Sequence, residues 1–319
     1  MALLTPLSIE AARELGRSYG VTLAELEPLV AGSVNSNFRA RTSDGRVFFA
    51  RLYEEQGVDG ARAELALLAD LAHAGVPVVE PLRPTHELPL FAGKPFALFP
   101  WVDGEIRCLA RVDADACRRV GRALAGVHLA SAGRAPLGAG RFGPSDMRAR
   151  LDEVERSTAR TDLLPAVARV KTLYDRFVPA RDRTLPSGIV HGDLFRDNVL
   201  FRGSDVAALL DFESAFHGPF VYDLMVTIAA WCYRDGFDVA HARAMVEGYA
   251  TLRPLEAAEV SAVPVEGALA CLRFATSRIT DFELRTPPGA RPARDFRRFL
   301  ARLEAIAGGA LAPAFTPNE

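Results

Sequence analysis

The N-terminal part of the chain begins with a helical pattern of apolar residues and continues with strand patterns. Ser8 can cap a helix that runs to about Gly20, because apolar residues recur there at helical spacing. Three β-prone runs follow at 26–30, 38–42 and 47–53, and short polar segments separate them. Runs joined in this way predict three successive antiparallel strands.

The pattern becomes mainly helical after Val102. Before this point, a helix at 60–73 and a hairpin ending in an apolar strand at 96–102 complete an antiparallel lobe with one packed helix. We therefore expect an α+β fold with an N-terminal lobe at 1–102 and a larger, mainly α-helical lobe at 103–319. Further helices are predicted at 115–131, 145–174, 222–233, 239–249, 258–285 and 292–306. Roughly the last dozen residues are expected to fray.

The composition is that of a compact enzyme without a strong charge bias. The chain has 319 residues, of which 49% are hydrophobic and 24% charged. Its 38 basic and 40 acidic residues give a net charge of −2, which offers no general attraction for nucleic acid or an anionic membrane. A small-molecule partner is therefore expected.

The cysteines and the N-terminus indicate a cytoplasmic protein. The four cysteines are scattered without a Cys-x-x-Cys pair, so we predict buried thiols and neither a zinc site nor disulfides. No basic segment followed by an apolar signal core opens the chain. No uncharged stretch approaches the roughly 20 residues that span a bilayer, so no membrane anchor is expected.

One stretch of the second lobe carries the groups that phosphoryl transfer needs. Asp193 and Asn198 are a loop apart, so the carboxylate can face an acceptor hydroxyl while the amide oxygen turns to a magnesium ion. Apolar runs at 199–201 and 206–210, joined by a turn, predict a hairpin that returns Asp211 beside Asn198. Because magnesium prefers hard oxygen ligands, this pair is predicted to bind the metal, and Asp193 is the predicted base.

A lone His-x-Asp is more often an ordinary turn, and a lone aspartate more often a cap. The combination of His191, Asp193, Asn198 and Asp211, in this order and spacing, is much more specific. His191 is expected to brace the loop by hydrogen bonding. Arg196 could meet a transferred phosphate or a substrate carboxylate through paired N–H donors.

These motifs resemble those of the aminoglycoside-phosphotransferase-like kinases. The segments are His-Gly-Asp-Leu-Phe-Arg-Asp-Asn at 191–198, Asp-Phe-Glu-Ser-Ala at 211–215 and Tyr-Asp-Leu at 222–224. The Leu-Phe-Arg-Asp insert and a late segment, Leu-Arg-Phe at 272–274 with Ser-Arg-Ile-Thr-Asp-Phe at 277–282, are similar to the type II homoserine kinase branch. The resemblance implies a protein-kinase-like fold, ATP and Mg²⁺ as cofactors, and L-homoserine as acceptor in threonine biosynthesis.

Two segments of the first lobe are candidates for the triphosphate of ATP. Ser33 and Asn35 lie in a polar connection that can bring N–H groups to phosphate oxygens, although a plain hairpin turn would look the same. Kinases usually place a lysine on the third strand, where this chain has Arg51. Its predicted partner is Glu64 on the following helix, and the alternative is a surface salt bridge.

Further residues are candidates for the adenine ring and the acceptor. Pro100, Trp101 and Val102 end an extended segment between the lobes, where backbone groups can bond to an adenine, although any core strand would look alike. Arg278 and Asp281 share a helical face and could bind the carboxylate and the ammonium of homoserine, or could simply pair with each other. Asp223 is either a brace beneath the loop or a helix N-cap.

The leading hypothesis is an ATP- and magnesium-dependent kinase of a small hydroxyl compound, with L-homoserine as the best named acceptor. Choline, ethanolamine, an aminoglycoside, a sugar or a protein Ser/Thr are alternatives within the same superfamily. Choline would call for an aromatic cage and an aminoglycoside for an acidic pocket. Arg51 replaces the usual lysine, and the polar connection that contains Ser33 and Asn35 lacks a Gly-x-Gly-x-x-Gly pattern. An inactive nucleotide-binding scaffold is therefore the alternative from a different class of function.

Overall fold

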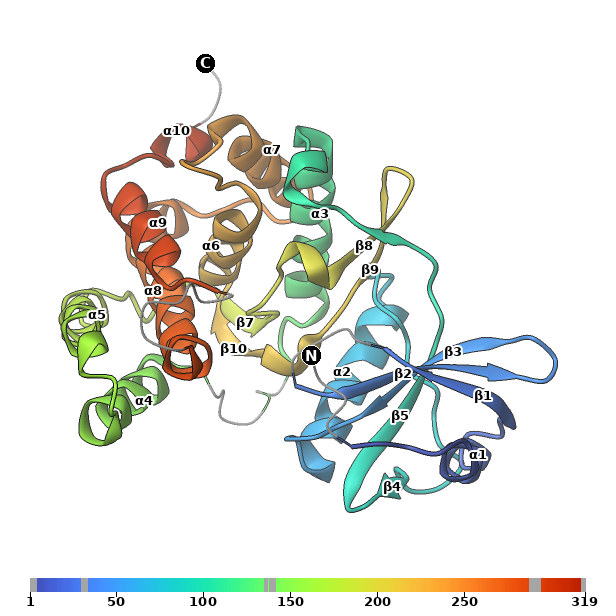
Figure 1. Ribbon diagram of the computed structural model, residues 1–319. Helices are drawn as coiled ribbons and strands as arrows, with labels where there is room; N and C mark the ends of the chain where they lie inside the picture. Colours follow the sequence, from blue (N-terminus) through green and yellow to red (C-terminus); the bar gives the residue numbers. More distant parts are fainter. Residues whose placement is uncertain (1–4, 30–33, 135–136, 138–141, 287–293, 317–319) are drawn as a thin grey trace. The chain divides into compact units, whose positions relative to one another are not determined.

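The structure is a computed structural model that describes residues 5–29, 34–134, 137, 142–286 and 294–316. It divides into two compact units (Figure 1). The N-terminal unit comprises Met1–Glu105 and Ala207–Glu213, and the C-terminal unit comprises Ile106–Val206 and Ser214–Glu319. The short segment Ala207–Glu213 thus belongs with the first unit, although it lies far along the chain.

An antiparallel sheet forms the centre of the N-terminal unit. Its strands lie in the order β1-β2-β3-β5-β4, and each neighbouring pair is antiparallel. The three successive strands expected from the sequence are confirmed, although the first begins and ends earlier than predicted. The bounds are Leu23–Pro28 for β1, Ser36–Thr42 for β2, Val47–Leu52 for β3, Leu90–Phe91 for β4 and Lys94–Pro100 for β5.

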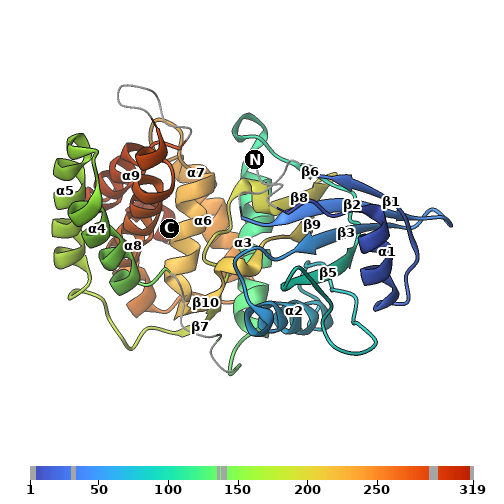
Figure 2. The ribbon, with the colours of Figure 1, turned by 60° about the horizontal axis from the view of Figure 1, so that its bottom comes forward.

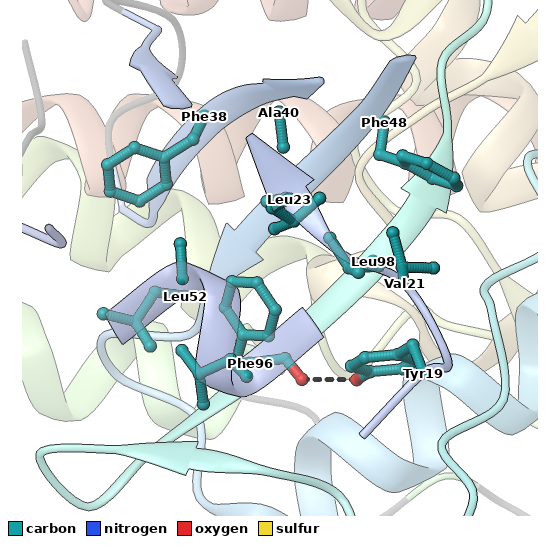
Figure 3. Packing of buried hydrophobic residues seen from close by; sticks show 12 residues of the cluster. Tyr19, Val21, Leu23, Phe38, Ala40, Phe48, Leu52, Phe96 and Leu98 are labelled. Atoms are coloured by element: carbon teal, nitrogen blue, oxygen red, sulfur yellow. Dashed lines mark hydrogen bonds between the residues drawn. The ribbon is translucent and has the colours of Figure 1, made fainter. Parts of the chain in front are cut away.

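Helix α1 (Ile9–Arg17) covers one face of this sheet. Ser8 caps the helix as predicted, because its hydroxyl accepts a hydrogen bond from the Ala11 N–H. Alternate residues of the strands point toward the helix and form a buried cluster that includes Phe38 and Leu52 (Figure 3). The Tyr19 hydroxyl, just after the helix, donates to the Phe96 carbonyl at 2.6 Å and joins the helix end to β5.

Helix α2 (Val58–His73) lies toward the opposite face of the sheet. Successive side chains of a strand point to opposite faces, so Arg51 points away from its neighbours Ala50 and Leu52, which belong to the buried cluster. The Arg51 guanidinium meets Glu64 of α2, and this contact places the helix on that side.

The C-terminal unit is mainly helical, and α6 (Phe220–Trp231) is buried along its whole length. Helices α3 and α7 lie side by side (Figure 2), and they approach closely because Gly248 has no Cβ: one placed there would lie 1.9 Å from the Arg118 carbonyl oxygen. The other helices are α3 (Ala114–Ala130), α4 (Pro144–Ser157), α5 (Leu164–Phe177), α7 (Val239–Ala250), α8 (Ala257–Asp281), α9 (Arg297–Ala307) and α10 (Ala312–Phe315).

Short strands flank the central loop of the C-terminal unit. Strand β7 (Ser187–Val190) pairs antiparallel with β10 (Phe216–Pro219), and the sequence did not predict either strand. The two strands of the predicted hairpin are present as β8 (Val199–Arg202) and β9 (Asp205–Leu209). The division between the units falls inside β9. Strand β6 (Glu105–Ile106) is a further short strand.

Three expectations about the C-terminal unit are wrong. The single helix at 145–174 is two helices, because Thr158 is extended and Pro165 has no N–H to continue an earlier helix. The end of the chain is not frayed over 312–315, where α10 buries Ala314. Cys108 is exposed, whereas the other three cysteines are buried.

Two further findings concern the start of α9 and the length and apolar character of the helices. The last long helix, α9, begins at Arg297; the residues 287–293 before it lie outside the described ranges. Within those ranges, no helix combines the length and the apolar character that a membrane crossing requires.

Candidate functional site

The loop at 191–198 leaves β7 in a conformation that Asp223 of α6 holds from below. The Asp223 carboxylate accepts hydrogen bonds from the His191 N–H at 2.7 Å and the Gly192 N–H at 2.8 Å. Gly192 has φ of 74°, and a Cβ there would lie 2.9 Å from the Ser214 carbonyl oxygen. Only glycine therefore fits this position without strain. The bracing interpretation of Asp223 is confirmed.

A fully buried histidine supports Asp223 in turn. His128 of α3 places Nε2 3.0 Å from the Asp223 carboxylate and Nδ1 2.7 Å from the Tyr249 hydroxyl. Burial opposes the charge of Asp223, but the hydrogen bonds from His128 and from the Gly192 N–H outweigh it and lower the pKa of the Asp223 carboxyl. Burial lowers the pKa of His128, so the ring is neutral, donates through Nε2 and accepts through Nδ1.

Inside the loop, His191 and Asn198 hold the backbone on either side of Asp193. The Asp193 N–H donates to His191 Nδ1 at 3.2 Å, and the Asn198 amide donates to the Asp193 carbonyl at 2.8 Å. His191 is fully buried. These contacts fit the bracing function expected for His191. The amide oxygen of Asn198 takes no part in the hydrogen bond to the Asp193 carbonyl.

The Asp193 carboxylate meets a cation that the sequence did not single out. Arg273 of α8 places Nη1 3.2 Å from Asp193 Oδ1 and 2.8 Å from the Gly192 carbonyl oxygen. The Asp193 side chain is 30% exposed, while that of Arg273 is 6% exposed. The carboxylate is therefore reachable from solvent and fixed from the interior.

Arg196 points into the C-terminal unit rather than freely into solvent. It is half-buried, and Nη1 donates to the Ala230 carbonyl at 2.6 Å near the end of α6. Burial lowers its pKa. Trp231 anchors the same loop, because its indole N–H donates to the Leu194 carbonyl at 3.0 Å.

Arg278 and Asp281 of α8 bond to different partners instead of forming the intrahelical pair considered as the alternative. Arg278 donates to the Asp295 carbonyl at 3.0 Å, and Arg150 of α4 donates to Asp281 at 2.6 Å. The Arg278 guanidinium lies over the ring of Phe299, which also neighbours Phe195 of the loop.

The surroundings of Arg278 are rich in positive charge. Burial lowers the pKa of Arg278 to about 9, and the charges of Arg302, Arg294 and Arg298 act in the same direction. The Arg302 guanidinium donates to the Ala229 carbonyl oxygen at 2.8 Å and so compensates the end of α6. An anion bound beside Arg278 would reduce the repulsion between these side chains.

In the N-terminal unit, Arg51 is surrounded by three carboxylates. Its Nη1 lies 3.4 Å from Glu64, 3.7 Å from Asp211 and 3.7 Å from Glu213. The sequence predicted Glu64 as a partner, and the structure places it there. It also adds Asp211 and Glu213, which reach Arg51 because Ala207–Glu213 belongs to this unit.

Three carboxyl groups face the single guanidinium of Arg51. Burial would lower the pKa of Arg51, but the carboxylates of Asp211 and Glu64 outweigh it and raise the pKa. Burial raises the pKa of Glu64 to about 8, against the attraction of Arg51. Glu64 Oε2 and Asp211 Oδ1 are buried atoms without a hydrogen-bond partner in the described part of the protein. A further cation at this carboxylate group would be stabilised.

Asp211 also has an unusual backbone. Its φ is 65°, a left-handed conformation that costs a non-glycine residue on the order of 1 kcal/mol. Such strain is found where a side chain must point in a defined direction. The described residues contain no group of three or more His, Cys, Asp or Glu arranged to hold a metal.

The predicted phosphate loop is partly described. Ser33 lies outside the described residues. Asn35 is buried, and its side-chain oxygen accepts a hydrogen bond from the Glu54 N–H at 3.0 Å, so this atom braces the end of β3. Ser36 donates to the Glu54 carboxylate, which also pairs with Lys94. Lys94, one of the two lysines in the chain, thus helps to brace the end of β3.

The predicted adenine segment follows β5 in the N-terminal unit. Pro100 ends the strand, and the Trp101 N–H donates to the Val47 carbonyl at 3.1 Å. The Trp101 indole N–H donates to Asp103 at 3.0 Å, and Arg39 lies over its ring. Val102 is half-buried in the extended segment that follows. Trp101 and Val102 are both half-buried, and their contact with an adenine stays a prediction.

Comparison with known proteins adds an independent finding. Residues 7–255 match the phosphotransferase enzyme family, which covers most of the chain. The chain is 36% identical over 306 residues to a homoserine kinase of Methylorubrum populi, with 91% of each chain covered. It is 37% identical over 279 residues to a homoserine kinase of Methylocella silvestris, with 83% of each covered. A homoserine kinase of Agrobacterium fabrum is 32% identical over 303 residues.

Solved structures support the fold. An amicoumacin kinase in complex with AMP-PNP, Ca²⁺ and its antibiotic has a TM-score of 0.69 at 15% identity, covering 92% of this chain and 90% of that one. A spectinomycin phosphotransferase with bound ADP and spectinomycin has a TM-score of 0.68 at 14% identity, covering 97% and 100%. The protein-kinase-like fold of these phosphotransferases, with its antiparallel N-terminal sheet and mainly helical C-terminal part, is thereby confirmed.

Proposed function

The chain belongs to the phosphotransferase enzyme family and is a kinase of small molecules, and from this premise we propose that it transfers the γ-phosphoryl group of ATP to the hydroxyl of L-homoserine. The observation that carries this proposal is the Asp193 carboxylate, which is accessible to solvent on a loop whose backbone Asp223 holds. The named relatives support homoserine as the acceptor over most of the chain.

Asp193 is the proposed base. It orients the acceptor hydroxyl and accepts its proton as the oxygen attacks the γ-phosphorus, while the bond from the γ-phosphorus to the bridging oxygen breaks and ADP leaves. Phosphoryl transfer depends mainly on positioning and charge. His191 and Asn198 hold the backbone on both sides, so the carboxylate keeps its direction during the reaction.

Asn198 and Asp211 are the proposed ligands of Mg²⁺. Asp211 Oδ1, which has no hydrogen bond among the described residues, and the three carboxyl groups around Arg51 fit a bound cation. When bound, the metal neutralises phosphate charge. Arg51, held by Glu64, is proposed to pair with the phosphates in place of the usual lysine.

The remaining nucleotide contacts are proposed from the first lobe. The backbone of Pro100, Trp101 and Val102 would bond to the adenine, and the connection that contains Ser33 and Asn35 would face the phosphates. Because the Asn35 side-chain oxygen already bonds to Glu54, backbone N–H groups or the Asn35 amide would make that contact.

The C-terminal unit supports an acceptor that carries a carboxylate. Arg278 lies among other arginines and near Phe299, which neighbours the loop residue Phe195. We propose that Arg278 binds the homoserine carboxylate, with the charge of Arg196 adding to the attraction. Asp281, which keeps its second oxygen outside the bond from Arg150, would accept from the homoserine ammonium.

A panel of acceptors tests the proposal. Radiolabelled ATP and the purified protein are incubated with L-homoserine, D-homoserine, L-serine, choline, ethanolamine, an aminoglycoside, a sugar and a generic protein. We expect transfer to L-homoserine with a kcat/KM at least about tenfold above that for any other acceptor, because its carboxylate and hydroxyl are both matched. Preferred transfer to choline or an aminoglycoside would refute the acceptor, and no transfer to any compound would refute the kinase assignment.

A further inference from the structure

Arg273 occupies the centre of the C-terminal unit and reaches the catalytic loop from α8. Its Nη1 donates to the Gly192 carbonyl and to Asp193 Oδ1, and its Nη2 donates to the Ser214 hydroxyl at 3.2 Å. Ser214 follows Asp211 by three positions in the sequence. One guanidinium thus bonds to the loop backbone, the proposed base and the segment that continues from the proposed metal ligand.

The guanidinium plane is fixed by its neighbours. Its carbon lies 4.3 Å from the ring centre of Phe142 and 4.1 Å from that of Phe274. Arg273 is 5% exposed. Rings within about 6 Å of a guanidinium attract it and restrict its rotation, so this side chain is a rigid element rather than a surface arginine.

Asp193 is the one carboxylate within ion-pair distance of Arg273 in the described ranges. Burying a guanidinium without a nearby anion is costly, so the geometry couples the two side chains. Arg273 Nε is buried and has no hydrogen-bond partner among the described residues. Its two Nη groups are directed to the loop and to Ser214.

We propose that Arg273 is a positioning residue that orients the Asp193 carboxylate for attack by the acceptor hydroxyl. The proposal rests on the base function proposed for Asp193. The contact to Oδ1 holds the carboxylate in one rotamer. The bond to the Gly192 carbonyl holds the adjacent backbone in the same register, so loop and side chain cannot move separately.

Two substitutions separate charge from geometry. Arg273→Gln keeps a shorter, neutral donor and removes the charge and the fork, while Arg273→Lys keeps the charge without the fork. We expect Arg273→Gln to lower kcat by about 10- to 100-fold, because misplacing a reacting group by about 1 Å can cost 10²-fold. Arg273→Lys should lose less. The KM for ATP should change by less than about twofold in both.

Arg181→Gln is the matched control. Arg181 is also a largely buried arginine of the C-terminal unit that lines the same small pocket as Arg273, but it pairs with Glu266 of α8 through two hydrogen bonds. We expect it to lower the melting temperature at least as much as Arg273→Gln and to leave kcat within about twofold, since Glu266 has no described contact to the loop.

A double-mutant cycle with Asp193→Asn decides the proposal. If Arg273 acts through Asp193, then Asp193→Asn combined with Arg273→Gln is no slower than Asp193→Asn alone. Millimolar guanidinium should also restore part of the kcat lost in Arg273→Ala and leave the kcat of Arg181→Ala unchanged. Additive losses in the cycle, or an unchanged kcat in Arg273→Gln, would overturn the positioning function. Full turnover of Asp193→Asn would refute the base assignment itself, which is a separate failure.

Discussion

Nε2 of His128 lies 3.0 Å from the carboxylate of Asp223, and neither side chain is exposed to solvent. This pair lies beneath the loop that carries Asp193, because the same carboxylate accepts from the N–H groups of His191 and Gly192. Tyr249 and Arg253 extend the network, since the Arg253 guanidinium donates to the Tyr249 hydroxyl and to Glu259. The conformation of the loop at 191–198 therefore depends on polar side chains that are distant from it in the sequence.

Asp223→Asn should destabilise the protein. An amide nitrogen would face one of the two loop N–H groups or the His128 N–H, and a buried donor would lose its acceptor. We expect a loss of roughly 2–4 kcal/mol in the free energy of unfolding, measured with urea. The control is Asp205→Asn, whose exposed pair with Arg119 should contribute less than about 0.5 kcal/mol. Equal losses in both variants would contradict the assigned function of Asp223.

The neutral state of His128 gives a pH dependence with a defined sign. Because its folded pKa is lowered below the ordinary 6.5, the unfolded chain binds a proton that the folded protein does not. Stability should therefore fall as the pH drops through about 6.5 toward the lower folded value. His128→Gln should flatten this part of the curve, and His86→Gln, at an exposed position, should not. Melting temperatures between about pH 5 and 8 give the answer.

Asp193→Asn should nearly abolish phosphoryl transfer while ATP still binds. The amide keeps the size of the side chain but cannot accept the hydroxyl proton, and a positioned base contributes on the order of 10²-fold or more. Asp197→Asn in the same loop is the control, because that side chain is 60% exposed and lies 3.9 Å from Arg294. If Asp193→Asn turns over substrate at nearly the rate of the natural protein, Asp193 is not the catalytic base.

Asp211→Ala should remove the gain in ATP affinity that magnesium provides. It withdraws an anionic ligand that Asn198 cannot replace alone. Calorimetric titration of ATP with and without magnesium measures the gain, with Asp205→Ala as the control. If the metal-dependent gain persists in Asp211→Ala, the metal is bound elsewhere.

The Arg51 group is tested by three substitutions. Arg51→Ala should weaken ATP binding and lower turnover, and it leaves three carboxylates without their cation. Arg51→Lys should keep partial activity because the charge remains. Glu64→Gln should be milder, since Asp211 and Glu213 still hold Arg51. ATP affinities and single-turnover rates separate these cases, and unchanged values for Arg51→Ala would mean that another group neutralises the phosphates.

Local patterns in the sequence were sufficient for much of the fold and for the family. The β-prone runs separated by short polar segments predicted strands β1 to β3, and Ser8 predicted the start of α1, because such runs and caps depend on neighbours along the chain. The motif from His191 to Asn198 is contiguous, so the resemblance to phosphotransferases could be recognised before any contact was known.

Long-range contacts required the tertiary structure. No sequence signal marked Arg273 as the partner of Asp193, because the two are 80 residues apart and a helix brings them together. Glu213 could have been suspected from its place beside Asp211, but its contact with Arg51 depends on Ala207–Glu213 joining the first unit. The sequence by itself determined the main helices and strands and the chemistry of the loop at 191–198. Only the packing of distant segments decided which charged side chains face one another. Burial makes such ion pairs strong, and proximity in the sequence does not predict them.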